Sequence, residues 1–312
     1  MLWIIFTILA YFLLSLTALV DEILLTGRLI RPKVYAFYVG ILGILVLVLI
    51  PFGFEIPNLF IAGLAILSGA LWIFALLSLY EALRRYEISR IIPAIGGILP
   101  IFTLCLSYLF AWQQGTPLES LSYLKIISFL LLISGSILIT WKGKEIINKK
   151  SLGLSILTAF LFALSFVTTK IIFLEQSFIS GLIWLRIGGF LTALLFIFFK
   201  EVREELFEKI KIKKKKALFQ NPKLAVIFLF NQIIGAGAGI LQSLAIYLAP
   251  IMYLAFINAM EGIRYVFILV FTIILSYKMP KILSEKITKP ILLKKIFAII
   301  LVIVGLIILS IG

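Results

Sequence analysis

Long apolar runs, separated by short charged or turn-rich breaks, dominate the sequence. A helix needs about 20 mainly apolar residues to cross the hydrocarbon core of a membrane. Ten runs approach or exceed that length: residues 2–20, 34–52, 58–83, 90–112, 123–141, 152–174, 178–199, 224–248, 250–277 and 291–311. Pro51 and Gly53 close the second run, and Ala249-Pro250 predicts a tight turn between the eighth and ninth. The pattern predicts an all-α membrane protein with ten transmembrane helices.

The composition places these runs in lipid rather than in a soluble core. Of the 312 residues, 63% are hydrophobic and 14% are charged, and the mean hydropathy is +1.20. A water-soluble surface needs far more polar side chains than this. The first run lacks the charged segment and cleavage site of a signal peptide, so we expect it to be retained. The expected location is a bacterial or archaeal plasma membrane, crossed many times.

The distribution of positive charge predicts the orientation in the membrane. The net charge is +15, and 25 of the 29 lysines and arginines follow the first, third, fifth, seventh and ninth runs. Cytoplasmic loops carry such an excess. We therefore expect that face to be cytoplasmic and both chain ends to be outside. The basic charge is explained as a topology signal, and nucleic acid is not an expected partner.

The longest segment between runs, residues 200–223, has two interpretations. Val202, Leu206 and Ile210 recur every four residues, which is a weak amphipathic pattern. The segment can lie along the membrane surface with its lysines near anionic headgroups, which would make membrane lipids a partner. It can equally be a solvated loop whose charge only sets the orientation.

Corresponding residues recur in the two halves of the chain. The matches include Thr17/Ser165 and Gly40/Gly188 at an offset of 148, and Ser78/Ser243 and Gly97/Gly262 at an offset of 165. Each copy holds five runs, so the second copy enters the membrane from the opposite face, as in the inverted repeats of many alternating-access carriers. The predicted units are a first repeat over 1–141, a cytoplasmic linker over 142–151, and a second repeat over 152–312 that includes the basic loop 200–223.

Four segments carry a resemblance to a known family: LLSLYEALRRYEISRIIPAIGGILPIFTL (76–104), WLRIGGFLTALLF (184–196), LLISGSILI (131–139) and VIVGLIIL (302–309). They resemble the EamA family of the drug/metabolite transporter superfamily. The resemblance implies two inverted five-helix repeats and a transport function. Two features depart from the family. Tyr265 stands in the second copy where the first has Pro100, and family members usually keep both termini in the cytoplasm, opposite to the charge distribution here.

Three ionisable residues lie near the middle of apolar runs. They are Glu261 and Arg264 in the ninth run and Arg186 in the seventh. A charge at the bilayer centre costs about 2.5–3.5 kcal/mol on insertion scales. Glu261 and Arg264 are three residues apart, so they share a helix face and can pair. Neutral groups hold helices together more cheaply, so these charges favour a water-filled binding cavity over helix packing.

The eighth run adds a narrow stripe of polar and small residues. Asn231, Gly235, Ala238 and Gln242 fall on one helix face. The two amides can hold helices together or line a cavity, and Gly235 with Gly239 predicts close helix packing. The candidate substrate-binding residues are Glu261, Arg264, Arg186, Asn258, Asn231 and Gln242, and no metal ligands are expected.

The sequence argues against an enzyme. There is no histidine, Asp21 is the only aspartate, and no phosphate-binding P-loop occurs. Cys105 is the only cysteine, so no disulfide forms within one chain. The expected function is secondary transport of a small anionic or zwitterionic metabolite by alternating access. The alternatives are a flippase for a lipid-linked substrate, and a non-transporting lipid-binding or scaffold protein.

No cofactor is expected. The expected partners are a small-molecule substrate, a coupled proton or other ion, membrane lipids and, as one option, a second copy of the chain. The spacing of Glu261 and Arg264 adds a hypothesis about coupling. If the arginine leaves Glu261 to hold the substrate, the carboxylate loses its partner and can take up a proton.

Overall fold

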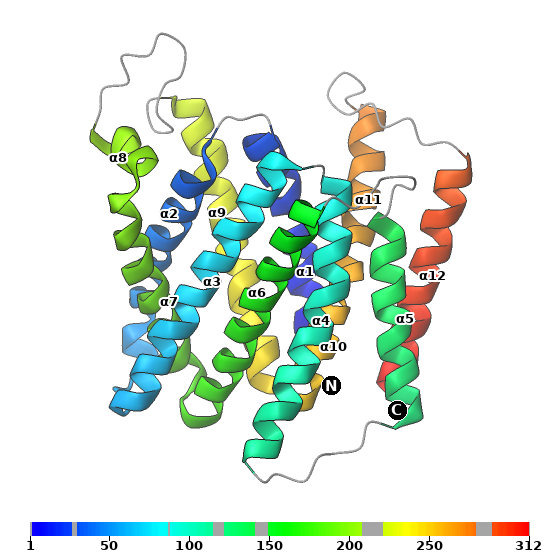
Figure 1. Ribbon diagram of the computed structural model, residues 1–312, viewed down its shortest axis with the longest axis horizontal. Helices are drawn as coiled ribbons and strands as arrows, with labels where there is room; N and C mark the ends of the chain where they lie inside the picture. Colours follow the sequence, from blue (N-terminus) through cyan, green and yellow to red (C-terminus); the bar gives the residue numbers. More distant parts are fainter. Residues whose placement is uncertain are drawn as a thin grey trace.

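The computed structural model describes residues 2–26, 30–86, 88–114, 122–140, 149–207, 221–278 and 289–311. Every regular element in these ranges is helical (Figure 1). The elements are α1 (Leu2–Thr26), α2 (Pro32–Leu42), η1 (Gly43–Phe52), α3 (Leu59–Arg85), α4 (Ile88–Gln113), α5 (Tyr123–Thr140), α6 (Lys149–Glu175), α7 (Phe178–Leu195), η2 (Phe196–Phe198), α8 (Lys200–Phe207), α9 (Pro222–Leu248), η4 (Ile251–Tyr253), α10 (Leu254–Ala259), α11 (Glu261–Lys278) and α12 (Lys289–Ile311).

The predicted all-helical class is confirmed. In the described ranges, nine helical stretches are long and apolar enough to cross a membrane. The apolar part of α5, Tyr123–Leu138, is shorter than these nine. Nine such stretches are consistent with an integral multi-pass membrane protein, and the tenth span stays a prediction.

Short capping motifs begin several helices. Asn58 accepts a hydrogen bond from the backbone N–H of Ile61 at 2.8 Å, which starts α3. Ser177 accepts one from the N–H of Ser180 at the start of α7. Such side chains satisfy backbone donors that have no partner in the first turn. In lipid an unsatisfied donor is especially costly, so the caps help to place the helix ends.

The second apolar run departs from a regular α-helix. After Leu42 the chain continues as the 3₁₀ helix η1, which contains Pro51. Proline lacks the N–H that a helix interior needs, which disfavours a continuous α-helix. Gly53 ends the segment with φ +119°, a left-handed conformation that only glycine adopts at low cost.

Helix α8 is held against α2 by buried and charged contacts. Val202 is fully buried in the protein, and Lys33 donates to Glu201 at 2.8 Å. The Lys33 ammonium holds the pKa of the Glu201 carboxyl below its ordinary value. Arg31 pairs with Glu204. Val202 therefore faces protein rather than lipid, and the later part of the predicted amphipathic pattern, including Ile210, lies outside the described residues.

Both chain ends lie on one face of the molecule, and α8 lies at the opposite face (Figure 1). This agrees with an even number of membrane crossings. We expect a reporter fused after Gly312 to be active outside the cytoplasm, because the basic segments follow odd-numbered runs. Paired periplasmic and cytoplasmic reporters at the same position provide the measurement. A cytoplasmic signal would show that the charge distribution does not orient this chain.

Helices α3 and α7 cross with their backbones in close approach. A Cβ atom on Gly69 would lie 2.2 Å from the carbonyl oxygen of Leu185, and one on Gly188 would lie 2.6 Å from the Ile66 backbone. The sequence predicted close packing at Gly235 instead. A Cβ there would meet Thr17 Cγ2 at 3.7 Å, an ordinary contact, so α9 meets a side chain of α1 at Gly235 and not a helix backbone.

The apolar core is divided differently on the two faces. On the face with the chain ends, one contiguous cluster joins Trp3 near the start of α1, Phe256 in α10 and Leu309 near the end of α12. Toward the opposite face the buried residues fall into separate clusters, one around Tyr35 and another around Ile91. A cavity lies among these clusters.

Candidate functional site

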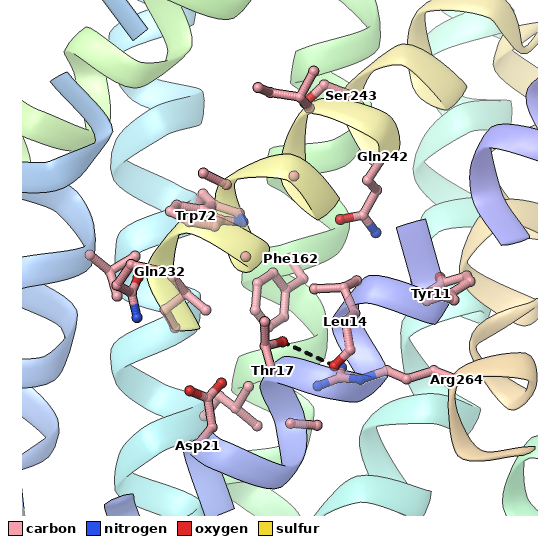
Figure 2. A pocket seen from close by; sticks show the side chains of 18 of the residues that line it. Tyr11, Leu14, Thr17, Asp21, Trp72, Phe162, Gln232, Gln242, Ser243 and Arg264 are labelled. Carbon is pink, nitrogen blue, oxygen red and sulfur yellow. Dashed lines mark hydrogen bonds between the residues drawn. The ribbon is translucent and has the colours of Figure 1, made fainter. Parts of the chain in front are cut away.

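A cavity of about 1430 Å³ lies within the helix bundle. It exceeds the volume of about 300–1,000 Å³ that is typical of small-molecule pockets. Most of its lining is apolar, and its polar lining residues include Tyr11, Thr17, Asp21, Trp72, Tyr80, Arg186, Asn231, Gln232, Gln242, Ser243, Asn258, Glu261, Arg264 and Tyr265. All six residues predicted from the sequence line this one cavity. Figure 2 shows α9 (yellow) and α1 (blue) contributing polar side chains while Arg264 extends from a third helix.

Glu261 and Arg264 form the predicted pair. Arg264 Nη1 lies 3.4 Å from Glu261 Oε1, and the two side chains are 20% and 12% exposed. The Tyr265 hydroxyl also hydrogen-bonds to Glu261. Arg264 Nε is buried with no hydrogen-bond partner among the described residues. The guanidinium therefore keeps a donor for a further acceptor.

The pair lies at a break in the helix that the sequence did not predict. The ninth run divides at Met260 into α10 and α11, and the N–H of Ile263 bonds to the carbonyl of Met260 at 2.9 Å instead of to that of Ala259. The Ala259 carbonyl accepts from Ser136 Oγ at 3.2 Å, and the Ile257 carbonyl accepts from the Tyr11 hydroxyl at 2.8 Å. Two neighbouring helices thus supply donors at the break.

The break changes the position of Glu261 within its helix. Glu261 is the first residue of α11, where the helix dipole stabilises negative charge. Gly262 follows it, and a Cβ on Gly262 would lie 2.6 Å from Ser136 Oγ. Gly262 is therefore the residue in the sequence that could have indicated a close approach of two helices at the break.

Arg186 projects into the cavity from α7. Its guanidinium carbon lies 4.8 Å from the centre of the Trp72 ring, in a cation–π arrangement. A Cβ on Gly239 would lie 2.7 Å from Arg186 Nη2, so the glycine leaves room for the arginine rather than for another helix. No described carboxylate lies within ion-pair distance of Arg186. The ring stabilises the cation without neutralising it.

The three predicted amides have different surroundings. Asn258 is 2% exposed and donates to Thr103 Oγ1 at 2.8 Å, which joins α10 to α4. Asn231 is 3% exposed and donates to Asp21 at 2.7 Å. Gln242 points into the cavity (Figure 2) and makes no hydrogen bond to another described residue. The first two hold helices together at the cavity wall, and Gln242 is open to a ligand.

The sequence-based selection missed Asp21, which lines the same cavity. Asp21 Oδ1 accepts hydrogen bonds from the Tyr35 hydroxyl and from Asn231 Nδ2. Tyr11, Thr17 and Asp21 lie along the part of α1 that faces the cavity (Figure 2). Thr17 and Asp21 are four residues apart, close to one helical turn, so they share a helix face, and this polar pair was the available signal.

The cavity reaches the surface of the molecule within the membrane-spanning segments. Leu45 and Val48 on η1 and Ile233 on α9 line the cavity, yet they are 67%, 73% and 69% exposed. Both segments belong to helical stretches that are long and apolar enough to cross a membrane. The cavity therefore has a lateral opening, bordered by η1 and α9.

The sequence matches none of the protein-family models and none of the curated proteins. It is similar in structure to a solved protein described only as "Crystal structure of protein". That similarity has a TM-score of 0.64 at 12% sequence identity, and it covers 96% of this chain and 97% of the other. At this identity the similarity concerns the fold alone: the chain has the same overall helical fold as that solved protein.

Proposed function

We propose that the protein is a membrane carrier for a small organic anion or zwitterion. The observation that carries this proposal is Arg186, a cation without a carboxylate partner among the described residues, facing a large cavity. An uncompensated charge in a low-dielectric site attracts a ligand of opposite charge strongly. Arg264 adds a second guanidinium, whose Nε has no partner in the described residues.

The packing of the helices supports two inverted repeats of five spans each, as in the EamA family. If the two copies correspond, α1 is equivalent to α6 and α3 to α9. α1 packs along α9, and α6 packs along α3, as this equivalence requires. The last spans of the copies, α5 and α12, pack against each other. We infer that α5 completes a set of ten spans.

One contact that differs between the two copies supports alternating access. α3 crosses α7 closely, whereas the equivalent pair, α9 and η1, borders the lateral opening. The contiguous apolar cluster around Trp3 and Phe256 closes the cavity toward the face with the chain ends. In an inverted repeat, exchange of the two arrangements would close one side and open the other.

A flippase for a lipid-linked substrate is the second candidate function. The observation that favours it is the lateral opening at Leu45, Val48 and Ile233. A lipid-linked substrate would leave its chain in the membrane while its charged headgroup reaches the arginines. Both candidates use the same cavity and differ in whether the substrate carries a lipid tail.

Ligand binding followed by flux tests the proposal. We expect organic acids or amino acids to raise the melting temperature of the purified protein, while the corresponding amides, which lack the carboxylate, do not. A ligand at 100 times its Kd stabilises the native state by about 2.7 kcal/mol. Counterflow of each stabilising compound into proteoliposomes then separates a carrier from a scaffold. Binding without flux would favour the non-transporting alternative, and binding confined to lipid-linked anions would favour the flippase.

A further inference from the structure

Asp21 is a carboxylate in the cavity wall that has no ion-pair partner among the described residues. Its oxygen Oδ1 accepts from two neutral donors, the Tyr35 hydroxyl and Asn231 Nδ2. No described residue donates to Oδ2, and Asp21 lines the cavity. An ionised carboxylate in an apolar environment is costly without a counter-charge. The site therefore favours a positively charged ligand.

The remaining hydrogen-bonding capacity of the site is small. The Tyr35 hydroxyl donates to Asp21 and accepts from Asn231 at 3.2 Å and from Gln232 at 3.3 Å, so its capacity is used. Asn231 Oδ1 is buried and has no hydrogen-bond partner among the described residues, on a side chain that is only 3% exposed. Asp21 Oδ2, Asn231 Oδ1 and Gln232 Oε1 accept no hydrogen bond from a described residue. Three oxygens replace only part of the hydration shell of a metal cation, whereas a proton needs one.

The groups that surround Asp21 belong to several helices. α2 supplies Tyr35, α3 supplies Tyr80, and α9 supplies Asn231 and Gln232. Arg264 on α11 is the charged group whose field reaches Asp21. Arg264 also pairs with Glu261, so its single charge is shared between two carboxylates.

We propose that Asp21 is the proton-binding site of the carrier and that one proton moves with each substrate anion. The proposal rests on the proposed function, because it assigns the coupling ion of the same cavity. A substrate anion at Arg264 cancels the positive field at Asp21. Asp21 then takes up a proton. The protonated carboxyl group can donate a hydrogen bond to the Asn231 side-chain oxygen or to the substrate.

The charge balance of the cavity agrees with this coupling. With Asp21 ionised, the two carboxylates Asp21 and Glu261 share the cavity lining with four cationic side chains, Arg186, Arg264, Lys294 and Lys295. Protonation of Asp21 adds one further unit of positive charge to this lining, which a single substrate anion offsets. The sequence suggested Glu261 as the proton acceptor, but Glu261 has Arg264 beside it and lies at a helix N-terminus. Asp21 has neither.

Infrared spectroscopy of the purified full-length protein in detergent, titrated with acid and base, tests the assignment. We expect the carbonyl stretch of a buried protonated carboxyl group to appear as the pH falls. Asp21→Asn should remove this band, while the matched variant Glu261→Gln should keep it. Tyr35→Phe removes a donor to the carboxylate and should strengthen proton binding about tenfold, which moves the midpoint to higher pH.

Three results would overturn the proposal: a band that survives Asp21→Asn, a band lost in Glu261→Gln, or a band that disappears at constant pH when Na⁺ replaces choline. The last would identify a sodium site. If Asp21→Asn does not yield folded protein, an unchanged midpoint in Tyr35→Phe also decides against Asp21. The measurement needs no transport, so its outcome is separate from that of the flux test.

Discussion

Gly69→Ala is expected to prevent stable folding. The new Cβ atom would lie 2.2 Å from the Leu185 carbonyl oxygen and 2.5 Å from the Gly189 nitrogen. Both are backbone atoms of α7, so no side-chain rotation relieves the contact. Overpacking in a core costs about 1–3 kcal/mol and occasionally more. Because the clash is with backbone atoms, we expect the loss of stability in this variant to reach or exceed the upper end of that range. Folded yield on size-exclusion chromatography and the melting temperature in detergent are the measurements.

Gly63→Ala is the matched control for this prediction. Gly63 is on the same helix, α3, and nothing lies within 4 Å of a Cβ atom built on it. Alanine is the better helix former, so this variant should fold at least as well as the wild type. If both variants behave alike, Gly69 would not be required for the close crossing of α3 and α7.

Arg186→Ala is expected to weaken binding of an anionic ligand about ten- to a hundredfold, because it removes a charged hydrogen-bond donor. The melting temperature without ligand should stay the same or rise. Arg186 has no carboxylate partner among the described residues, so its removal relieves an uncompensated charge. These opposite effects distinguish a ligand-binding role from helix packing, which would lower the stability.

Two variants provide controls for Arg186→Ala, and ligand titration followed by thermal shift measures all three. Arg186→Lys keeps the charge but loses the planar fork and the stacking on Trp72, so it should recover only part of the affinity. Arg85→Ala removes an exposed arginine that pairs with Glu81 at 2.9 Å and does not line the cavity, so this variant should bind ligand normally. A loss of stability in Arg186→Ala with unchanged ligand affinity would contradict the prediction.

Local sequence features were sufficient for the helical class and for part of the cavity. Length and hydropathy are properties of one segment at a time, so the apolar runs predicted where helices lie. The pairing of Glu261 with Arg264 also follows from one helix, because residues three apart share a face. The high free-energy cost of a charge at the bilayer centre was sufficient to predict Arg186 as a cavity residue from the sequence.

Contacts between segments that are distant in the chain could not be predicted from the sequence. Asp21 and Asn231 are 210 residues apart and meet because α1 packs along α9. The sequence could not show whether Gly69 or Gly235 faces a helix backbone, since both lie in apolar runs. The break at Met260 depends on donors from Tyr11 and from another helix, as described above.

The physical reason lies in the solvent. In a soluble protein, an amphipathic pattern shows which face of a helix points inward. In this chain, exposed side chains such as Leu45 and buried ones such as Phe256 are equally apolar, so the pattern does not show which face of a helix points inward. The sequence alone determined that these segments are helices in a membrane and which of their residues are costly there. Only the tertiary structure decided which faces meet, because steric fit and individual hydrogen bonds between distant helices make that choice.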